Sequence, residues 1–209
     1  MVPADRIALS PPGLPPSEAA SLVVAATTAL TALRDSAGLV SGERVLIRGA
    51  AGGVGTAAVQ LARAMGGHVT ALARGECAVP LADLGADEII DYRSSGPEQT
   101  GPFDVIIDAA GSDLRRYRRR LTRHGRMVTV GLSAAALTVI ALSSVHGSRR
   151  IRTFSANPQT AILDDLSGYV TSGALRPVVN TVYPLSDIAA AHRAFSAGGA
   201  LGKQVITVP

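Results

Sequence analysis

The chain has 209 residues, of which 47% are hydrophobic and 17% charged, and its mean hydropathy is +0.27. This composition excludes an intrinsically disordered protein and allows a folded core of ordinary size. The net charge is +4, but aromatic residues make up only 3% of the chain, too few to stack nucleic-acid bases beside the arginines. The single cysteine, Cys77, excludes an internal disulfide and a cysteine-based zinc site.

The longest apolar segments, residues 19–33 and 134–145, are interrupted by threonine or serine or are too short to cross a membrane. The first residues, Met1-Val-Pro-Ala-Asp5, do not have the basic start and apolar stretch of a secretory signal. We therefore expect a soluble cytoplasmic protein with no membrane partner and no nucleic-acid partner.

Residues 1–16 form a proline-rich lead-in, of which residues 10–16 exclude a helix or a central strand. Ser17 is the expected N-cap of a helix that runs to about residue 33. Short apolar runs then alternate with helical patterns, which is typical of a parallel sheet covered by helices. The predicted strands are 44–49, 68–73, 88–92, 103–109 and 126–131, and the predicted helices are 54–65, 77–84 and 114–121, with a loop at 94–102. The predicted fold class is α/β, a doubly wound parallel sheet forming a Rossmann-like dinucleotide-binding domain.

The remaining chain is less regular. After Gly131 we expect an apolar helix or loop, then a strand at 150–155, a helix at 160–172, an extended segment at 178–183, a helix at 186–196 capped by Ser186, and a strand at 204–208. No repeat or low-complexity linker divides the chain. Residues 1–209 are therefore expected to form one domain, with 178–209 as a return segment.

Arginines are concentrated at residues 115–126, where Leu114, Tyr117 and Leu121 recur among them at helical spacing. This pattern favours the solvated face of an amphipathic helix over a nucleic-acid site.

The central motif is Gly49-Ala-Ala-Gly52-Gly53-Val-Gly55, between a predicted strand and a predicted helix. Glycines at such a turn allow the backbone to approach a pyrophosphate, which is then bound at the helix N-terminus. An ordinary strand-to-helix turn is the alternative. Because the strand and the helix are both present, we expect a nucleotide cofactor.

The end of the second strand distinguishes NAD from NADP. A carboxylate there binds the ribose 2′-hydroxyl, whereas a basic residue accommodates a 2′-phosphate. Arg74 follows this strand, which favours NADP(H), while Glu76 two residues later keeps NAD open.

These segments, together with Leu84-Gly-Ala-Asp-Glu-Ile-Ile-Asp-Tyr92, Phe103-Asp-Val-Ile-Ile-Asp108 and Gly202-Lys203-Gln-Val205, resemble the cofactor domain of medium-chain dehydrogenases/reductases. The branch that they resemble is the zinc-free quinone oxidoreductases and enoyl reductases, including those of polyketide synthases. The resemblance implies NADPH-dependent reduction of an activated C=C bond in an enone, quinone or enoyl thioester. It also implies cofactor-binding roles for Thr28, Gly52, Gly53, Val54, Gly55, Arg74, Tyr92, Gly131, Leu132, Phe154, Asn157 and Lys203.

In this family a GroES-like substrate domain precedes the cofactor domain, and the sequence shows no counterpart of it. The resemblance therefore implies a substrate site that lacks one wall and needs a separate substrate-domain or synthase partner, with unpaired strand edges near 178–183 and 204–208. It also implies a homodimer through an edge strand near residues 150–155. His146 and Asp108 are the candidates for an acid or base, and no cluster has the spacing of a metal site.

Two further hypotheses remain open. One is a non-redox cyclase or isomerase on a retained reductase scaffold, and the other is a cofactor-binding interaction module. Product of unchanged mass without cofactor turnover would indicate the cyclase or isomerase, and the oligomeric state tests the pairing expected of the module.

Overall fold

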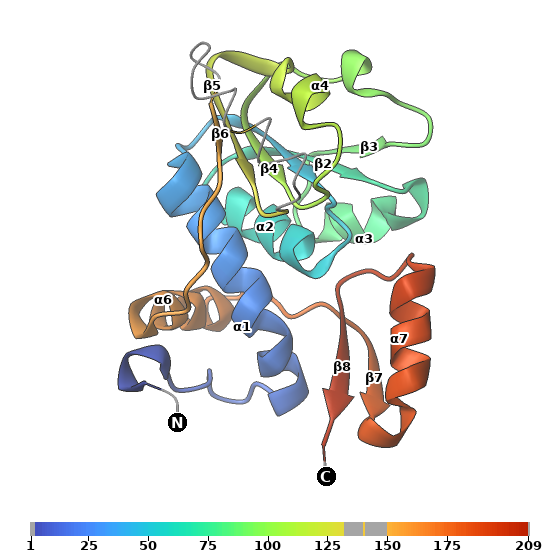
Figure 1. Ribbon diagram of the computed structural model, residues 1–209. Coiled ribbons are helices and arrows are strands. Elements are labelled where there is room, and N and C mark those ends of the chain that lie inside the picture. Colours follow the sequence, from blue (N-terminus) through green and yellow to red (C-terminus); the bar gives the residue numbers. More distant parts are fainter. Residues whose placement is uncertain (1–2, 132–139, 141–149, 209) are drawn as a thin grey trace.

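Six parallel strands form the main sheet of the computed structural model, which describes residues 3–131, 140 and 150–208. The strands are β1 (Arg44–Arg48), β2 (His68–Ala73), β3 (Glu88–Asp91), β4 (Phe103–Asp108), β5 (Leu121–Thr129) and β6 (Ile151–Arg152). Their order is β3-β2-β1-β4-β5-β6, which is the order of the Rossmann fold (Figure 1). The predicted doubly wound α/β fold is confirmed. The order reverses between β1 and β4, so the crevice at their carboxyl ends is the expected ligand position.

Helices cover both faces of this sheet. The helices α1 (Pro16–Leu30), α2 (Gly53–Ala64), α3 (Ala78–Asp83) and α6 (Thr160–Thr171) contribute side chains to the core on one face. The short helix α4 (Leu114–Arg118) packs Leu114 and Tyr117 onto the other face. Its arginines at 115 and 116 are exposed, as the amphipathic pattern predicted.

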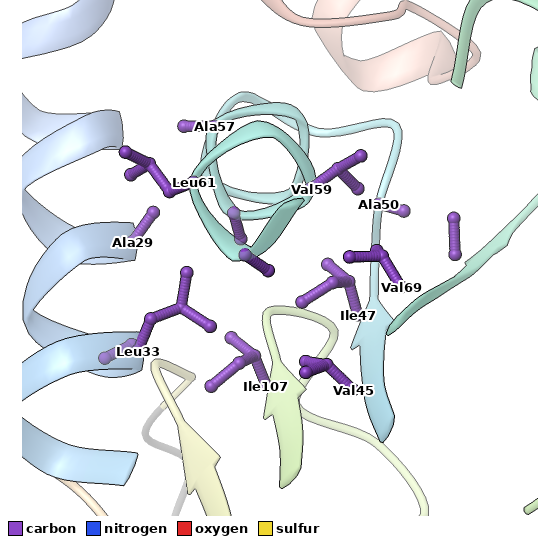
Figure 2. Close-up of a cluster of buried hydrophobic side chains, with 14 of the residues drawn as sticks. Ala29, Leu33, Val45, Ile47, Ala50, Ala57, Val59, Leu61, Val69 and Ile107 are labelled. Carbon is purple, nitrogen blue, oxygen red and sulfur yellow. The ribbon is translucent and has the colours of Figure 1, made fainter. Parts of the chain in front are cut away.

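The larger core lies between the sheet, α1 and α2. Val45, Ile47 and Ile107 point to this face, because alternate residues of a strand share a side. Figure 2 shows Leu61 of α2 pointing toward Ala29 of α1, within the same cluster of buried side chains. Val45, Ile47, Ile107 and Leu61 are fully buried, and each burial stabilises the fold by about 2 kcal/mol.

A second, two-stranded parallel sheet lies apart from the first at the lower right of Figure 1, and its strands are β7 (Val179–Pro184) and β8 (Lys203–Thr207). Helix α7 (Ile188–Ala197) connects them and packs on β8. The segments expected to be unpaired therefore pair with each other, although each strand keeps an outer edge in the part of the chain that the structure describes.

Short helical turns complete the fold. Four are 3₁₀ turns, at Ala4–Arg6, Gly75–Cys77, Pro97–Gln99 and Leu185–Asp187. A π-helical segment, Thr31–Ala37, continues α1 and ends at Gly38, which has a left-handed backbone.

The sequence misplaced two helix caps. Helix α1 begins at Pro16 after Pro15, so Ser17 lies inside the first turn and does not cap it. A proline at the first helical position has its φ already set for a helix, which explains this start. Helix α7 has Asp187 at its N-cap after a 3₁₀ turn, so Ser186 does not cap it either.

The largest boundary differences from the prediction lie around α4, β5 and β6. Strand β5 spans Leu121–Thr129 instead of 126–131. The helix expected at 114–121 ends at Arg118, because Leu121 already pairs with Phe103 as the first residue of β5. The strand expected at 150–155 is limited to Ile151–Arg152.

The first helix is longer than its sequence suggested. Helix α1 and the π-helical segment form one 22-residue helix, Pro16–Ala37, long and apolar enough by length and composition to cross a membrane. Half of its most apolar window is buried inside the protein, and it packs on α2, α6 and β8. This packing is that of a core helix. The expectation that no segment reaches this length was wrong.

Candidate cofactor site at the carboxyl edge of the sheet

The glycine-rich turn connects β1 to α2 at the point where the strand order reverses. Gly49 leaves β1 with a left-handed backbone (φ +72°), and Gly52 is the N-cap residue of α2. The N–H of Gly52 donates to the Gly49 carbonyl at 3.0 Å, which closes the turn. The predicted strand–turn–helix context of the motif is therefore present.

Two of these glycines leave no room for a side chain. A Cβ on Gly55 would lie 2.1 Å from the Gly49 carbonyl oxygen, so this glycine lets the helix pack against the turn. A Cβ on Gly53 would lie 2.2 Å from Cε of Lys203. The first turn of α2 therefore packs closely on the glycine turn and against Lys203, while Gly52 at its N-cap stays exposed and offers the backbone that a pyrophosphate approaches.

The start of α2 has no capping side chain among the described residues. The N–H groups of Gly53, Val54 and Gly55 precede the first intrahelical acceptors and point out of the helix start. These donors and the positive end of the helix dipole form an anion-binding site.

The return strand β8 reaches this turn directly. Gly202 forms an isolated parallel bridge with Gly52, and its N–H donates to the Ala51 carbonyl at 2.8 Å. The aliphatic part of Lys203 lies on Gly53, which brings the ammonium group close to the start of α2. A cation beside the positive end of a helix is unfavourable unless an anion lies with it. The pair of helix start and Lys203 therefore favours a negatively charged ligand.

Helix α1 closes the other side of this arrangement. Ser21, Ala25, Gly53 and Lys203 line one small hollow between α1, α2 and the start of β8. Thr28 lies one helical turn beyond Ala25 on the same side of α1 and is 9% exposed. The predicted residues Thr28 and Lys203 are thus placed on the side of α1 and α2 where the turn lies.

Arg74 follows the last residue of β2 and lies at the same edge of the sheet. Its guanidinium faces the backbone of Gly199, because a Cβ on Gly199 would lie 2.7 Å from Nη2. Arg74 forms no hydrogen bond or ion pair with any residue in the described part of the chain. Its charge is therefore available to a ligand.

Glu76, the carboxylate that left NAD as an alternative cofactor, is bound to another side chain. Glu76 accepts a hydrogen bond from Nη1 of Arg93 at 2.8 Å, and both side chains are exposed. The backbone N–H of Glu76 and then Arg93 lower the pKa of this carboxyl, so it is ionised at neutral pH. Tyr92, predicted to lie near the adenosine, follows β3 and is 52% exposed.

Asp108 is a structural residue, which corrects its place among the acid–base candidates. It is fully buried and accepts from Arg48 Nη1 at 2.6 Å, from the Thr129 hydroxyl at 2.9 Å and from the N–H of Gly111. Arg48 lies 3.8 Å over the ring of Tyr117. Because both carboxylate oxygens have donors and no surface is exposed, substrate cannot reach Asp108.

The other predicted residues are spread along the edge beyond β4 and β5. Gly131 follows β5 and lies beside Gly111, whose Cα would be 3.2 Å from a Cβ on Gly131. Phe154 is half-buried against the larger core, and Asn157 is exposed in the segment before α6. Leu132 and His146 lie outside the described residues.

The described residues do not fit a metal ion. Within the described ranges, no group of three histidine, cysteine, aspartate or glutamate side chains is close enough to hold one. Cys77 is buried in the core at the end of a 3₁₀ turn.

A separate cavity of about 160 Å³ lies between the N-terminal segment, α1 and α6. Its lining is almost entirely apolar and includes no titratable side chain. It is not a candidate for chemistry.

Sequence reasoning missed three contributors at this edge, namely Arg48, Arg93 and Gly199. Arg48 carried a usable signal, because a charged residue at the end of a buried strand needs a buried partner such as Asp108. Gly199 and Arg93 gave no such signal, since their contacts join segments that are distant in the sequence.

Comparison with known proteins places the chain in a family. The model described as zinc-binding dehydrogenase matches residues 84–206, more than half of the chain. The chain belongs to the zinc-binding dehydrogenase family. The predicted resemblance to medium-chain reductases of the quinone oxidoreductase and enoyl reductase type is confirmed.

Three similar proteins illustrate this membership. The human mitochondrial NAD(P)H oxidoreductase RTN4IP1 is 30% identical over 236 residues, covering 100% of this chain and 60% of the relative. The quinone oxidoreductase from Coxiella burnetii has a TM-score of 0.84 and 31% identity, over 91% of this chain and 60% of that one. The CurF ER cyclopropanase from the curacin A biosynthetic pathway has a TM-score of 0.83 and 27% identity, over 99% and 66%. The chain thus spans about 60% of the length of RTN4IP1 and of the Coxiella structure.

Proposed function

We propose that this chain is the NADPH-binding part of a zinc-free reductase that acts on an activated C=C bond in an enone, quinone or enoyl thioester. The observation that carries the proposal is the start of α2, which has no side-chain cap and has Lys203 lying against it, at the switch point of a Rossmann sheet. The names of an NAD(P)H oxidoreductase and a quinone oxidoreductase among similar proteins support the same chemistry.

The residues at the edge of the sheet divide the binding of NADP(H) among them. The N–H groups of Gly53, Val54 and Gly55 hold the pyrophosphate, and Lys203 adds a positive charge on the same side. Arg74 holds the adenosine 2′-phosphate, with Tyr92 beside it. When bound, the dihydronicotinamide would supply a hydride to the substrate.

We place the nicotinamide end along β4 and β5, because a dinucleotide in this fold lies across the strand ends on both sides of the point where the strand order reverses. Gly131, Phe154 and Asn157 supply backbone and packing there, while Thr28 approaches from α1. Leu132, which lies outside the described residues, stays a predicted contact. The acid–base candidate that remains is His146.

The substrate side needs more protein than this sheet provides. Hydride transfer requires a dry pocket over the nicotinamide, and relatives of greater length have further residues that could cover it. We propose that a substrate domain or synthase partner completes the site, in polyketide or other secondary metabolism. The end position of β6 in the sheet also supports a homodimer through that edge. The cytoplasmic location stays a prediction.

The test is a binding titration followed by a turnover assay. We expect NADPH to bind more tightly than NADH, and Lys203→Met to weaken NADPH binding roughly tenfold, as the loss of one charge-assisted contact does. Loss of NADPH absorbance with an enone, a quinone or an enoyl thioester, alone or with a partner chain, would establish the reductase. Bound NADPH that no substrate or partner oxidises would contradict it.

The second candidate is a non-redox cyclase or isomerase on the same scaffold, and the name of the CurF ER cyclopropanase among the similar structures supports cyclisation on such a scaffold. Mass spectrometry of the product separates the two. A product two hydrogens heavier, with NADPH consumed in equal amount, indicates the reductase. A product formed without NADPH consumption indicates the second candidate.

A further inference from the structure

Two arginines and two carboxylates meet where β2 and β3 end. Ala73 is the register partner of Asp91, so the residues that follow both strands lie at one corner of the sheet. Arg74 and Glu76 come from the β2 side, and Arg93 comes from the β3 side. The corner therefore carries positive and negative side chains next to one another, and the two kinds act in opposite ways on a ligand bound there.

Contacts between the two loops fix which charges are free. Nη1 of Arg93 donates to Glu76 at 2.8 Å, while the backbone N–H of Arg93 donates to Oδ1 of Asp91 at 2.9 Å. The second carboxylate oxygen of Asp91 lies against Gly75. Arg74 forms no hydrogen bond or ion pair in the described part of the chain, although its charge acts on the Glu76 carboxylate.

We propose that Arg93 is a specificity-determining residue that selects a cofactor with a 2′-phosphate by holding the Glu76 carboxylate away from the ribose. This inference rests on the proposed function, because it concerns the same adenosine end of the cofactor. It assigns the selection to a pair of residues outside the glycine turn.

The physical reason is the double effect of a free carboxylate at this corner. An unpaired glutamate would accept a hydrogen bond from a ribose 2′-hydroxyl and so favour NADH. It would also repel a 2′-phosphate, whose charge Arg74 attracts. The ion pair with Arg93 removes both effects, even though an exposed pair of this kind adds little to folding stability.

The experiment measures the ratio of the Kd for NADH to the Kd for NADPH in four proteins. These are the wild type, Arg93→Gln, Glu76→Gln, and the double variant. Arg116→Gln is the matched control, because Arg116 forms an exposed 2.8 Å pair with Glu98 away from this corner. Adenosine 2′,5′-bisphosphate and 5′-AMP serve as probes that contain no nicotinamide.

We expect Arg93→Gln to lower the preference for NADPH roughly tenfold, with the same change between the two adenosine probes. Glu76→Gln and Arg116→Gln should each change it less than about twofold. The double variant should recover most of the wild-type preference, because removal of Glu76 makes its partner unnecessary. Equal thermal unfolding of all variants checks that folding is unchanged.

Three results would overturn the inference. An unchanged preference in Arg93→Gln would show that the pair is irrelevant. A double variant as poor as Arg93→Gln would show that Arg93 acts by direct contact with the phosphate. Equal affinity of the wild type for NADH and NADPH would show that the protein does not select a 2′-phosphate, without refuting the proposed function. Absence of binding to either dinucleotide would instead refute the proposed function itself.

Discussion

The two sheets of the molecule differ in how completely the described chain buries them. In the six-stranded sheet, Val45, Leu46, Ile47, Ile106 and Ile107 have no exposed surface. In the two-stranded sheet, Val205 is the buried residue of β8, and Val182 of β7 remains 46% exposed. The six-stranded sheet is therefore stabilised by contacts within the described chain, whereas the two-stranded sheet depends on its attachment to the first.

That attachment passes through the proposed cofactor site. Gly202 joins β8 to the glycine turn, and Gln60 of α2 exchanges hydrogen bonds of 2.9 and 3.1 Å with the backbone of Arg176 ahead of β7. The exposed apolar residues lie beyond these contacts, at Val182, Leu185, Ile188, Phe195 and Val208. Ligand binding at the turn should therefore stabilise the junction more than either sheet by itself.

The largest expected effect comes from the buried ion pair of the main sheet. Arg48→Met should destabilise the protein by about 3–5 kcal/mol, because it leaves the Asp108 carboxylate buried without its cation. Urea unfolding measures this. Arg63→Met is the control, since the Arg63 side chain, 3.0 Å from Asp87, is 58% exposed and the pair should contribute under about 1 kcal/mol. Equal costs for the two variants would contradict the assignment of Asp108 as a buried anchor.

A core truncation in each sheet tests the comparison itself. Ile47→Ala removes fully buried side-chain volume and should cost about 2–5 kcal/mol. Val182→Ala removes a half-exposed side chain and should cost less than about 1 kcal/mol. A denaturant titration of each variant under the same conditions gives the two free energies of unfolding. A cost for Val182→Ala that approached the one for Ile47→Ala would show that the two-stranded sheet is buried in solution, for instance in a dimer.

A smaller effect is expected at the junction. Gly202→Ala forces a Cβ to 2.1 Å from the Val178 carbonyl oxygen, at a residue with φ +83°. The substitution should lower the free energy of unfolding by about 2–3 kcal/mol and should also weaken NADPH binding. Gly173→Ala is matched in backbone, at φ +75°, but meets nothing within 4 Å. Its cost should be about 1–2 kcal/mol, with no loss of NADPH affinity. Calorimetry of binding and of unfolding gives both quantities.

The smallest expected effect is a pH dependence of folding stability that comes from Glu43, the residue directly before β1. Burial raises the pKa of Glu43, but hydrogen bonds from Arg126 and from the Val40 N–H outweigh it and hold the pKa below its ordinary value. Such a carboxylate contributes its full stability above the ordinary pKa, about 4.3, and loses it as the pH falls through the lowered value. The contribution should be about 1 kcal/mol. Glu43→Gln should therefore flatten the acid loss of stability below about pH 4, and an unchanged profile would contradict this.

Much of the main sheet could be predicted from the sequence, because each strand from β1 to β4 is a short apolar run bounded by turn residues. The glycine turn was equally readable, since Gly49, Gly52 and Gly55 lie between a predicted strand and a predicted helix, which is the context that the motif requires. The helix caps were not, because Pro16 provides a start that competes with Ser17. The position of Arg74 against Gly199 was also hidden, since it depends on how the loop between α7 and β8 folds back on the sheet.

The most direct test of the proposed dinucleotide site is amide hydrogen exchange with and without saturating NADPH. The account predicts slower exchange at residues 53–56, where α2 begins, and at residues 74–76, with little change in the middle of α6. Protection confined to other segments, or none at all despite added NADPH, would contradict the placement of the cofactor at the carboxyl edge of the sheet.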